Sequence, residues 1–157
     1  MTEVYFYHLE RQPLDKVLPK MLATGLERGW RAVVQAGSEE RVEALSALLW
    51  TQADDSFLPH GSKSDGFAAL QPVWLTADTG NPNNANVRFF VDGAAPQGFD
   101  SLTRAVIIFD GADEAAVARA REEWKRFKGQ GHAVSYWQQD DSGRWQNRAQ
   151  TRSGATS

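Results

Sequence analysis

The stretch that decides the fold is 113–139, DEAAVARAREEWKRFKGQGHAVSYWQQ, which predicts one long helix capped by Asp113, a glycine stop and a final strand. Residues four apart on a helix share a stripe. One stripe is apolar and ends in aromatic rings: Ala116, Ala120, Trp124 and Phe127. The adjacent stripe is mostly cationic: Val117, Arg121, Lys125 and Lys128. The simpler interpretation is a core-facing stripe beside a solvated basic edge. The alternative is a binding site for something both acidic and apolar.

The chain before this stretch begins with alternating strands and helices. Residues 4–9, VYFYHL, are rich in β-branched and aromatic side chains and predict a strand. Residues 14–28 have apolar side chains at helical spacing, which predicts a helix in spite of Pro19 within it. Residues 31–36 predict a short buried strand, and Ser38 with two glutamates after it predicts the capped start of a second helix.

The middle of the chain changes character. Residues 51–72 are rich in Gly, Pro, Ser and Asp and predict a long loop, yet Phe57 and Phe67 lie within it. Further strands are predicted at 73–77, 87–92, 104–110, 132–139 and 144–147. The strand at 104–110 contains AVIIF, a run typical of a central strand that is buried on both faces.

This pattern predicts an α/β fold with one domain at 1–148, in which helices cover both faces of a mostly parallel or mixed twisted sheet. Residues 149–157 are small and polar and are predicted to be a disordered tail. A chain of 157 residues with 41% hydrophobic residues is large enough to fold without disulfides or metals. Its net charge of −3 disfavours a broad nucleic-acid-binding face, so any DNA contact is expected to be indirect.

The sequence lacks the patterns of several kinds of active site. It has no cysteine, which excludes thiolate nucleophiles and sulfur-ligated zinc, and its three histidines are not at metal-site spacing. The first strand–helix turn, HLERQP at 8–13, has no glycine, so it lacks the pattern of a dinucleotide-binding or phosphate-binding loop. No leader or membrane-spanning pattern is visible, and we expect a soluble cytoplasmic protein without catalytic residues, metals or cofactors.

Four segments, in order and at matching spacing, resemble the chi subunit family of bacterial DNA polymerase III. They are VYFYHLE at 4–10, RAVVQAGSEERVEALSALLW at 31–50, SFLPHG at 56–61 and AREEWKRFKGQGHAVSYWQQDDSGRWQ at 120–146. The resemblance implies a non-catalytic replisome adaptor with a sheet like that of nucleotide-binding folds but without a nucleotide site. It also implies two partners: the psi subunit of the clamp loader, and the acidic C-terminal tail of single-stranded DNA-binding protein.

The resemblance implies a separate surface for each partner. The psi surface matches Trp50, Phe57, Pro59 and His60. Trp50 could equally be a core residue at a helix end, so Phe57 is the better candidate. The tail surface matches Arg121, Trp124, Lys125 and Lys128. Val117 stands where a well-known family member has a lysine, which makes the cationic row shorter.

Two other hypotheses remain at this point. The first is a nucleotide- or phosphate-binding enzyme on a degenerate α/β sheet, for which saturable thermal stabilisation by nucleotides or metals would be the evidence. The second is a helicase partner that binds the Trp50–Phe57 surface in competition with psi.

Overall fold

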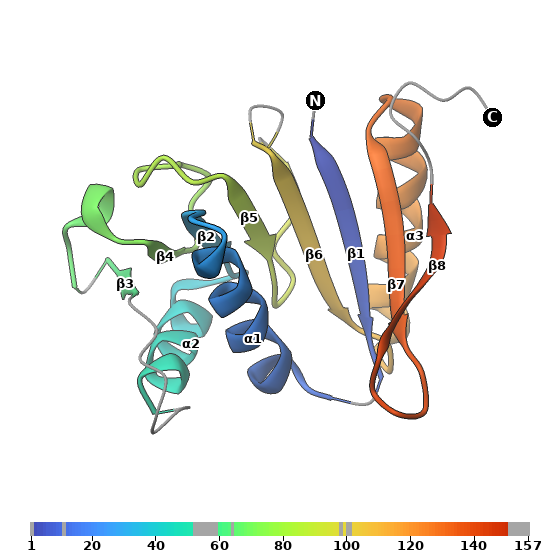
Figure 1. The fold of residues 1–157 in the computed structure, drawn as a ribbon, viewed down its shortest axis with the longest axis horizontal. Helices are drawn as coiled ribbons and strands as arrows, with labels where there is room; N and C mark the ends of the chain where they lie inside the picture. Colours follow the sequence, from blue (N-terminus) through green and yellow to red (C-terminus); the bar gives the residue numbers. More distant parts are fainter. Residues whose placement is uncertain are drawn as a thin grey trace.

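The structure is a computed structural model that describes residues 2–10, 12–51, 60–63, 65–97, 99 and 102–150, and only the backbone of residues 50 and 51. Within these residues it is a single eight-stranded sheet with helices on both faces (Figure 1), which confirms the predicted α/β class. The strands are β1 (Glu3–Leu9), β2 (Ala32–Gln35), β3 (Gly61–Ser62), β4 (Val73–Thr76), β5 (Val87–Phe90), β6 (Arg104–Asp110), β7 (Ala133–Gln139) and β8 (Trp145–Gln150). The helices are α1 (Leu14–Glu27), α2 (Glu39–Thr51), the 3-10 helix η1 (Ala68–Leu70) and α3 (Glu114–Gly129).

The sheet is built around β1 and β6. The strand order is β3-β4-β2-β5-β6-β1-β7-β8, and every described pairing is parallel except the β7–β8 hairpin. Phe6 of β1 is in register with Ile107 of β6 on one side and with Tyr136 of β7 on the other. Residues 105–109 of β6 are all buried, as expected for a central strand whose two faces are both covered.

The helices divide the two faces of the sheet between them. α1 and α2 pack on one face through a core that includes Leu18, Leu22 and Val42. α3 packs on the opposite face, where Ala120 and Phe127 join a core with strand residues such as Phe6. Figure 1 shows α1 and α2 in front of the sheet at its β2 end and α3 behind it at its β7 end. None of the helices in the described part of the chain is long and apolar enough to span a bilayer.

Local capping explains where two helices begin. Asp113 Oδ1 accepts hydrogen bonds from the backbone N–H groups of Ala115 and Ala116, at 3.0 and 3.2 Å. Ser38 Oγ accepts one from the Arg41 N–H at 3.3 Å. These bonds satisfy N–H groups that have no partner within the helix. Both caps agree with the sequence-based prediction, and Pro19 is accommodated inside α1.

The structure differs from the sequence-based prediction at three places. The two-residue strand β3 and the short helix η1 lie in the segment that was predicted to be only a loop. Strand β8 extends through Gln150, so Ala149 and Gln150 belong to the sheet and not to the predicted tail. Pairing with β7 supplies the backbone hydrogen bonds that hold these small and polar residues, which have no strand-like pattern of their own.

We predict that Gly111→Ala lowers the free energy of unfolding by about 1–3 kcal/mol, as overpacking does in a filled site. A Cβ at Gly111 would overlap the His8 imidazole and would come within 2.7 Å of the Leu9 carbonyl oxygen. Urea denaturation measures the loss. Gly129→Ala is the matched control because a Cβ there meets nothing within 4 Å and alanine favours helix. Equal stability of the two variants would show that the Gly111 site can relax.

Candidate peptide-binding site on α3

Helix α3 brings three of the four predicted tail-binding residues around one cavity. The cavity has a volume of about 220 Å³ and is lined by Arg121, Trp124, Lys125, Tyr136 and Ala149. The side chains of Arg121 and Lys125 are exposed, whereas Trp124 is half-buried. Lys128 is half-buried in the last turn of α3 and does not line this cavity.

Trp124 forms a fixed apolar wall of the cavity. Its ring centroid lies 5.9 Å from that of Phe6 and 6.1 Å from that of Tyr136, with the Tyr136 ring edge-on. These contacts attach it to the core beneath α3, whose buried row is Ala116, Ala120 and Phe127. The two interpretations of the α3 stripe are therefore compatible, because Trp124 packs one side against the core and leaves another open to the cavity.

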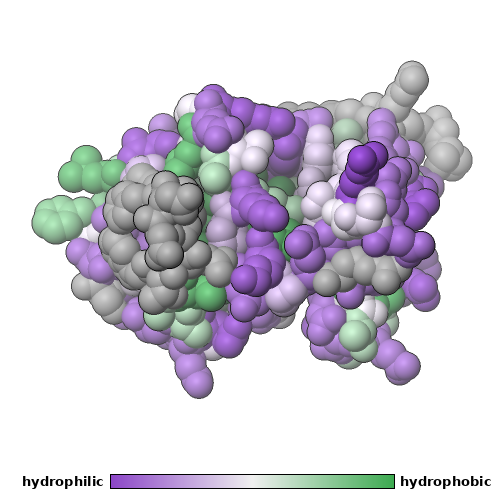
Figure 2. Space-filling model, turned by 60° about the horizontal axis from the view of Figure 1, so that its bottom comes forward, coloured by the Kyte–Doolittle hydropathy of each residue, from purple (hydrophilic) through white to green (hydrophobic). Residues whose placement is uncertain are grey.

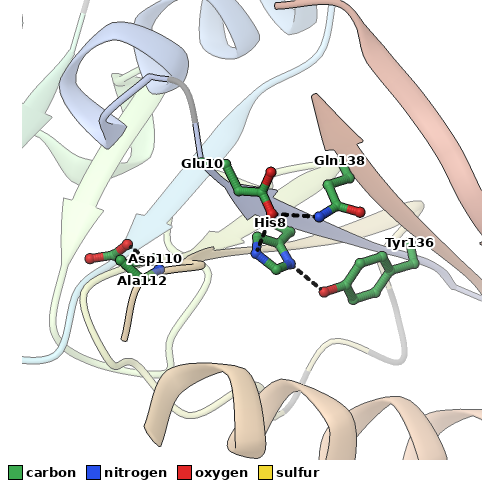
Figure 3. Close-up of polar contacts among 6 residues, drawn as sticks. All are labelled: His8, Glu10, Asp110, Ala112, Tyr136 and Gln138. Carbon is green, nitrogen blue, oxygen red and sulfur yellow. Dashed lines mark hydrogen bonds and ion pairs between the residues drawn. The ribbon is translucent and has the colours of Figure 1, made fainter. Parts of the chain in front are cut away.

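Tyr136 reaches the cavity from β7 and is held by a chain of polar contacts (Figure 3). Its hydroxyl lies 2.6 Å from His8 Nδ1. His8 Nε2 lies 3.2 Å from Glu10 Oε1, which also accepts a hydrogen bond of 2.6 Å from Gln138 Nε2. A neutral His8 with its proton on Nε2 satisfies both of its contacts, because Nδ1 then accepts from the tyrosine and Nε2 donates to the carboxylate.

Burial keeps the Tyr136 hydroxyl protonated. Burial raises the pKa of Tyr136 above its usual value; the positive charge of Arg121 opposes this rise and Glu10 adds to it. The hydroxyl is therefore neutral near pH 7 and remains a hydrogen-bond donor. Arg121 lies close enough to act on Tyr136 electrostatically, so the cation and the aromatic wall belong to one site.

The contacts of His8 also fill the crevice where a sheet of this type usually binds its ligand. After β1 the chain crosses to α1 on one face, and after β6 it crosses to α3 on the other, so the two loops diverge there. The His8 imidazole packs so closely on Gly111 that a Cβ at that glycine would overlap it. The His8 side chain thus lies at this position.

The residues that were predicted to bind psi are only partly described. Trp50 lies near the end of α2, with its side chain outside the described part, and Phe57 and Pro59 fall outside the described residues altogether. His60 is 4% exposed, and its Nε2 lies 3.3 Å from the Ser46 carbonyl oxygen of α2. Among the described residues, His60 is therefore buried against α2, and its contact with psi stays a prediction.

Two residues of the α3 cavity, Tyr136 and Ala149, were missed in the sequence. Alternation along β7 puts Tyr136 on the same face as the buried Val134, which was a usable signal. Ala149 carried no such signal, because it reaches the cavity only through the β7–β8 pairing, where Tyr136 and Ala149 are in register.

We predict that Tyr136→Phe costs about 0.5–1.5 kcal/mol of stability in urea denaturation, the usual contribution of one hydrogen bond. The change removes the hydroxyl that meets His8 and keeps the ring that faces Trp124. Tyr5→Phe is the matched control, since the half-buried Tyr5 makes no hydrogen bond through its hydroxyl to any described residue. A Tyr136→Phe variant as stable as the parent chain would mean that water satisfies His8 equally well.

Comparison with known proteins now gives the chain its family. The sequence model of the family described as "DNA polymerase III chi subunit, HolC" matches residues 1–135, which include strands β1 to β6, all of α3 and the start of β7. A protein of Rickettsia prowazekii (strain Madrid E), "Probable DNA polymerase III subunit chi", is 31% identical over 87 residues. That alignment spans 55% of this chain and about half, 53%, of the length of the relative. Because the family model matches most of its length, the chain belongs to the chi subunit family of DNA polymerase III.

Proposed function

We propose that this chain is a non-catalytic adaptor of the replication machinery that holds the acidic C-terminal tail of single-stranded DNA-binding protein on α3. The observation that carries the proposal is the cavity where two exposed cations of α3, Arg121 and Lys125, border an aromatic wall. Membership of the chi subunit family supports a role beside DNA polymerase III.

The cavity suits a peptide that ends in an apolar residue with a free carboxylate. The planar guanidinium of Arg121 can donate two parallel hydrogen bonds to that carboxylate. Trp124 and Tyr136 offer an apolar surface for the last side chain. Lys125 lies one turn after Arg121 and attracts the acidic residues that precede the end of the tail. Val117 is half-buried against the core, so the row has no third cation at that position.

We propose that psi binds at the other end of the sheet, near the end of α2 and the β3 edge. The exposed large hydrophobic side chains of the described residues are Phe67 and Leu70, at 76% and 73% exposure. Figure 2 shows hydrophobic side chains projecting at the left, the end of the molecule where Figure 1 places η1. Phe67 also has a φ of 55°, which is rare for a non-glycine residue. Exposed apolar residues near the predicted psi surface support a protein partner there.

We expect Arg121→Ala to weaken binding of a single-stranded DNA-binding protein tail peptide by about 1–3 kcal/mol, the range for loss of a charge-assisted hydrogen bond. Isothermal titration calorimetry at two salt concentrations measures this loss, and parent affinity should fall as salt rises. Arg119→Ala is the matched control, because Arg119 is an exposed cation of α3 outside this cavity. Equal affinities of the two variants would reject the assigned site.

We expect Phe57→Ala to weaken psi binding by about 2 kcal/mol, as loss of a central aromatic contact typically does. Phe67→Ala should weaken it less, because Phe67 lies outside the matched segment and only extends the surface. Arg119→Ala serves as the control, because Arg119 is exposed on α3, away from the β3 edge. Pull-down and calorimetry with purified psi measure the effects, and full affinity in both phenylalanine variants would place psi elsewhere.

A further inference from the structure

Half of one sheet face carries no helix in the described part of the chain. α1 and α2 cover the β2 end of this face, and α3 lies on the opposite side. In Figure 1 no helix stands in front of β6, β1, β7 and β8. In α/β proteins this position normally carries a helix that buries the face of the sheet.

Aromatic side chains line this open half. The Trp137 ring is nearly parallel to the rings of Tyr5 and Tyr7, with centroids 6.0 and 6.1 Å away. The Trp145 ring meets Tyr7 edge-on at 4.9 Å. All four side chains are half-buried, so they present apolar surface that remains in contact with solvent. Tryptophan and tyrosine are enriched at protein interfaces, where they often contribute most of the binding energy.

A groove of about 360 Å³ runs between this aromatic face and α1. Its lining includes three cations, Lys20, Arg28 and Arg104, and no carboxylate. Lys20 and Arg28 are exposed and lie two turns apart on the same side of α1. Arg104 is held in place at the foot of β6, with its guanidinium 4.1 Å from the Tyr5 ring centroid and 3.3 Å from Glu3 Oε1.

The wall of the groove on α1 has room for a second helix. A Cβ at Gly25 would meet nothing within 4 Å, so this wall is open near the C-terminal end of α1. The partner helix would lie beside α1 (Leu14–Glu27), which has 14 residues. At 1.5 Å per residue α1 is about 21 Å long, so a partner helix of roughly 16 residues spans it.

We propose that this groove binds an acidic amphipathic helix of a protein partner, which lies beside α1 and completes the helical layer on the open half of the sheet. Its apolar stripe would cover the Trp137 and Trp145 rings, and its carboxylates would meet Lys20 and Arg28. The groove lies on the face of β7 opposite to the α3 cavity, so this interaction is separate from the proposed capture of the tail peptide.

An acidic helix fits these observations better than a nucleic acid does. Stacked aromatics with nearby arginines can also bind single strands. A strand, however, needs cations repeated along its backbone, whereas this groove has three and the chain has a net charge of −3. A single amphipathic helix needs only an apolar floor with cations at its margin.

The test uses the full chain and a fluorescent helix-stabilised peptide of roughly 16 residues with leucines at i, i+3, i+4 and i+7 and glutamates beside them. Fluorescence anisotropy should show saturable binding that weakens about tenfold in Lys20→Glu/Arg28→Glu, consistent with the loss of two ion pairs at a half-desolvated site. The control Lys63→Glu/Arg119→Glu makes the same change in net charge at exposed positions outside the groove. It should bind the peptide as the parent chain does.

A second pair of variants tests shape. Gly25→Trp should fill the groove and abolish binding, whereas Gly25→Ala should retain it; circular dichroism and thermal melting confirm that each variant is folded.

Arg121→Ala should leave the affinity for this peptide unchanged, and the groove variants should leave the affinity for the tail peptide unchanged, so the two sites can fail independently. The proposal is overturned if the acidic peptide fails to bind, or if it binds the groove variants with the same affinity as the parent chain. It is also overturned if a control peptide with lysines in place of the glutamates binds with the same affinity as the acidic peptide. A twelve-nucleotide oligothymidylate that binds more tightly than the acidic peptide, through Lys20 and Arg28, would overturn it too.

Discussion

The parallel pairing of β1 with both β6 and β7 is the constraint on which the rest of the structure depends. It joins residues near the start of the chain to residues about 100 positions later in β6 and about 130 positions later in β7, a closure that local interactions cannot offset. Burial of apolar side chains from all three strands, such as Phe6, Ile107 and Val134, supplies the compensating free energy. The same pairing sets His8 beside Tyr136, and so positions one wall of the α3 cavity.

Helix α3 serves both the core and the surface because its two stripes are adjacent. Ala116, Ala120 and Phe127 face the sheet, and the small alanines let the helix approach it closely. Arg121 and Lys125 lie one stripe away and stay in solvent. Trp124 stands at the boundary, where the rings of Phe6 and Tyr136 hold it. Because one wall of the cavity is part of the core, the proposed peptide site would cost little entropy to organise.

The uneven distribution of helices leaves different surfaces on the two faces of the sheet. On one face α3 presents cations beside a small aromatic cavity. On the other, the region beyond α1 leaves the aromatic side chains of β1, β7 and β8 half-covered. At the β3 edge, Phe67 and Leu70 are exposed on a short 3-10 helix. Separation of these surfaces is what an adaptor requires, because partners that bind apart from one another do not compete.

Local features of the sequence predicted the elements well, because their causes are local. Helical spacing, the caps at Ser38 and Asp113 and the apolar run at 105–109 identified two helices and the central strand to within one or two residues. They also separated the core stripe of α3 from its cationic stripe. The two-residue β3 and the helix η1 escaped notice, because pairing with β4 and contacts with distant residues stabilise them. Nothing periodic can be seen in so few residues.

The sequence by itself therefore determined the α/β class, the glycine-free first turn, the order of the main elements and the α3 residues Arg121, Trp124 and Lys125. Only the tertiary structure decided that Tyr136 and Ala149 complete that cavity, that His60 is buried against α2, and that an aromatic groove lies open beside α1. The physical reason is that strand order and face coverage depend on contacts between residues far apart in the chain. The pattern of side chains predicts which face of a helix or strand is apolar, but it does not predict which other helix or strand covers that face.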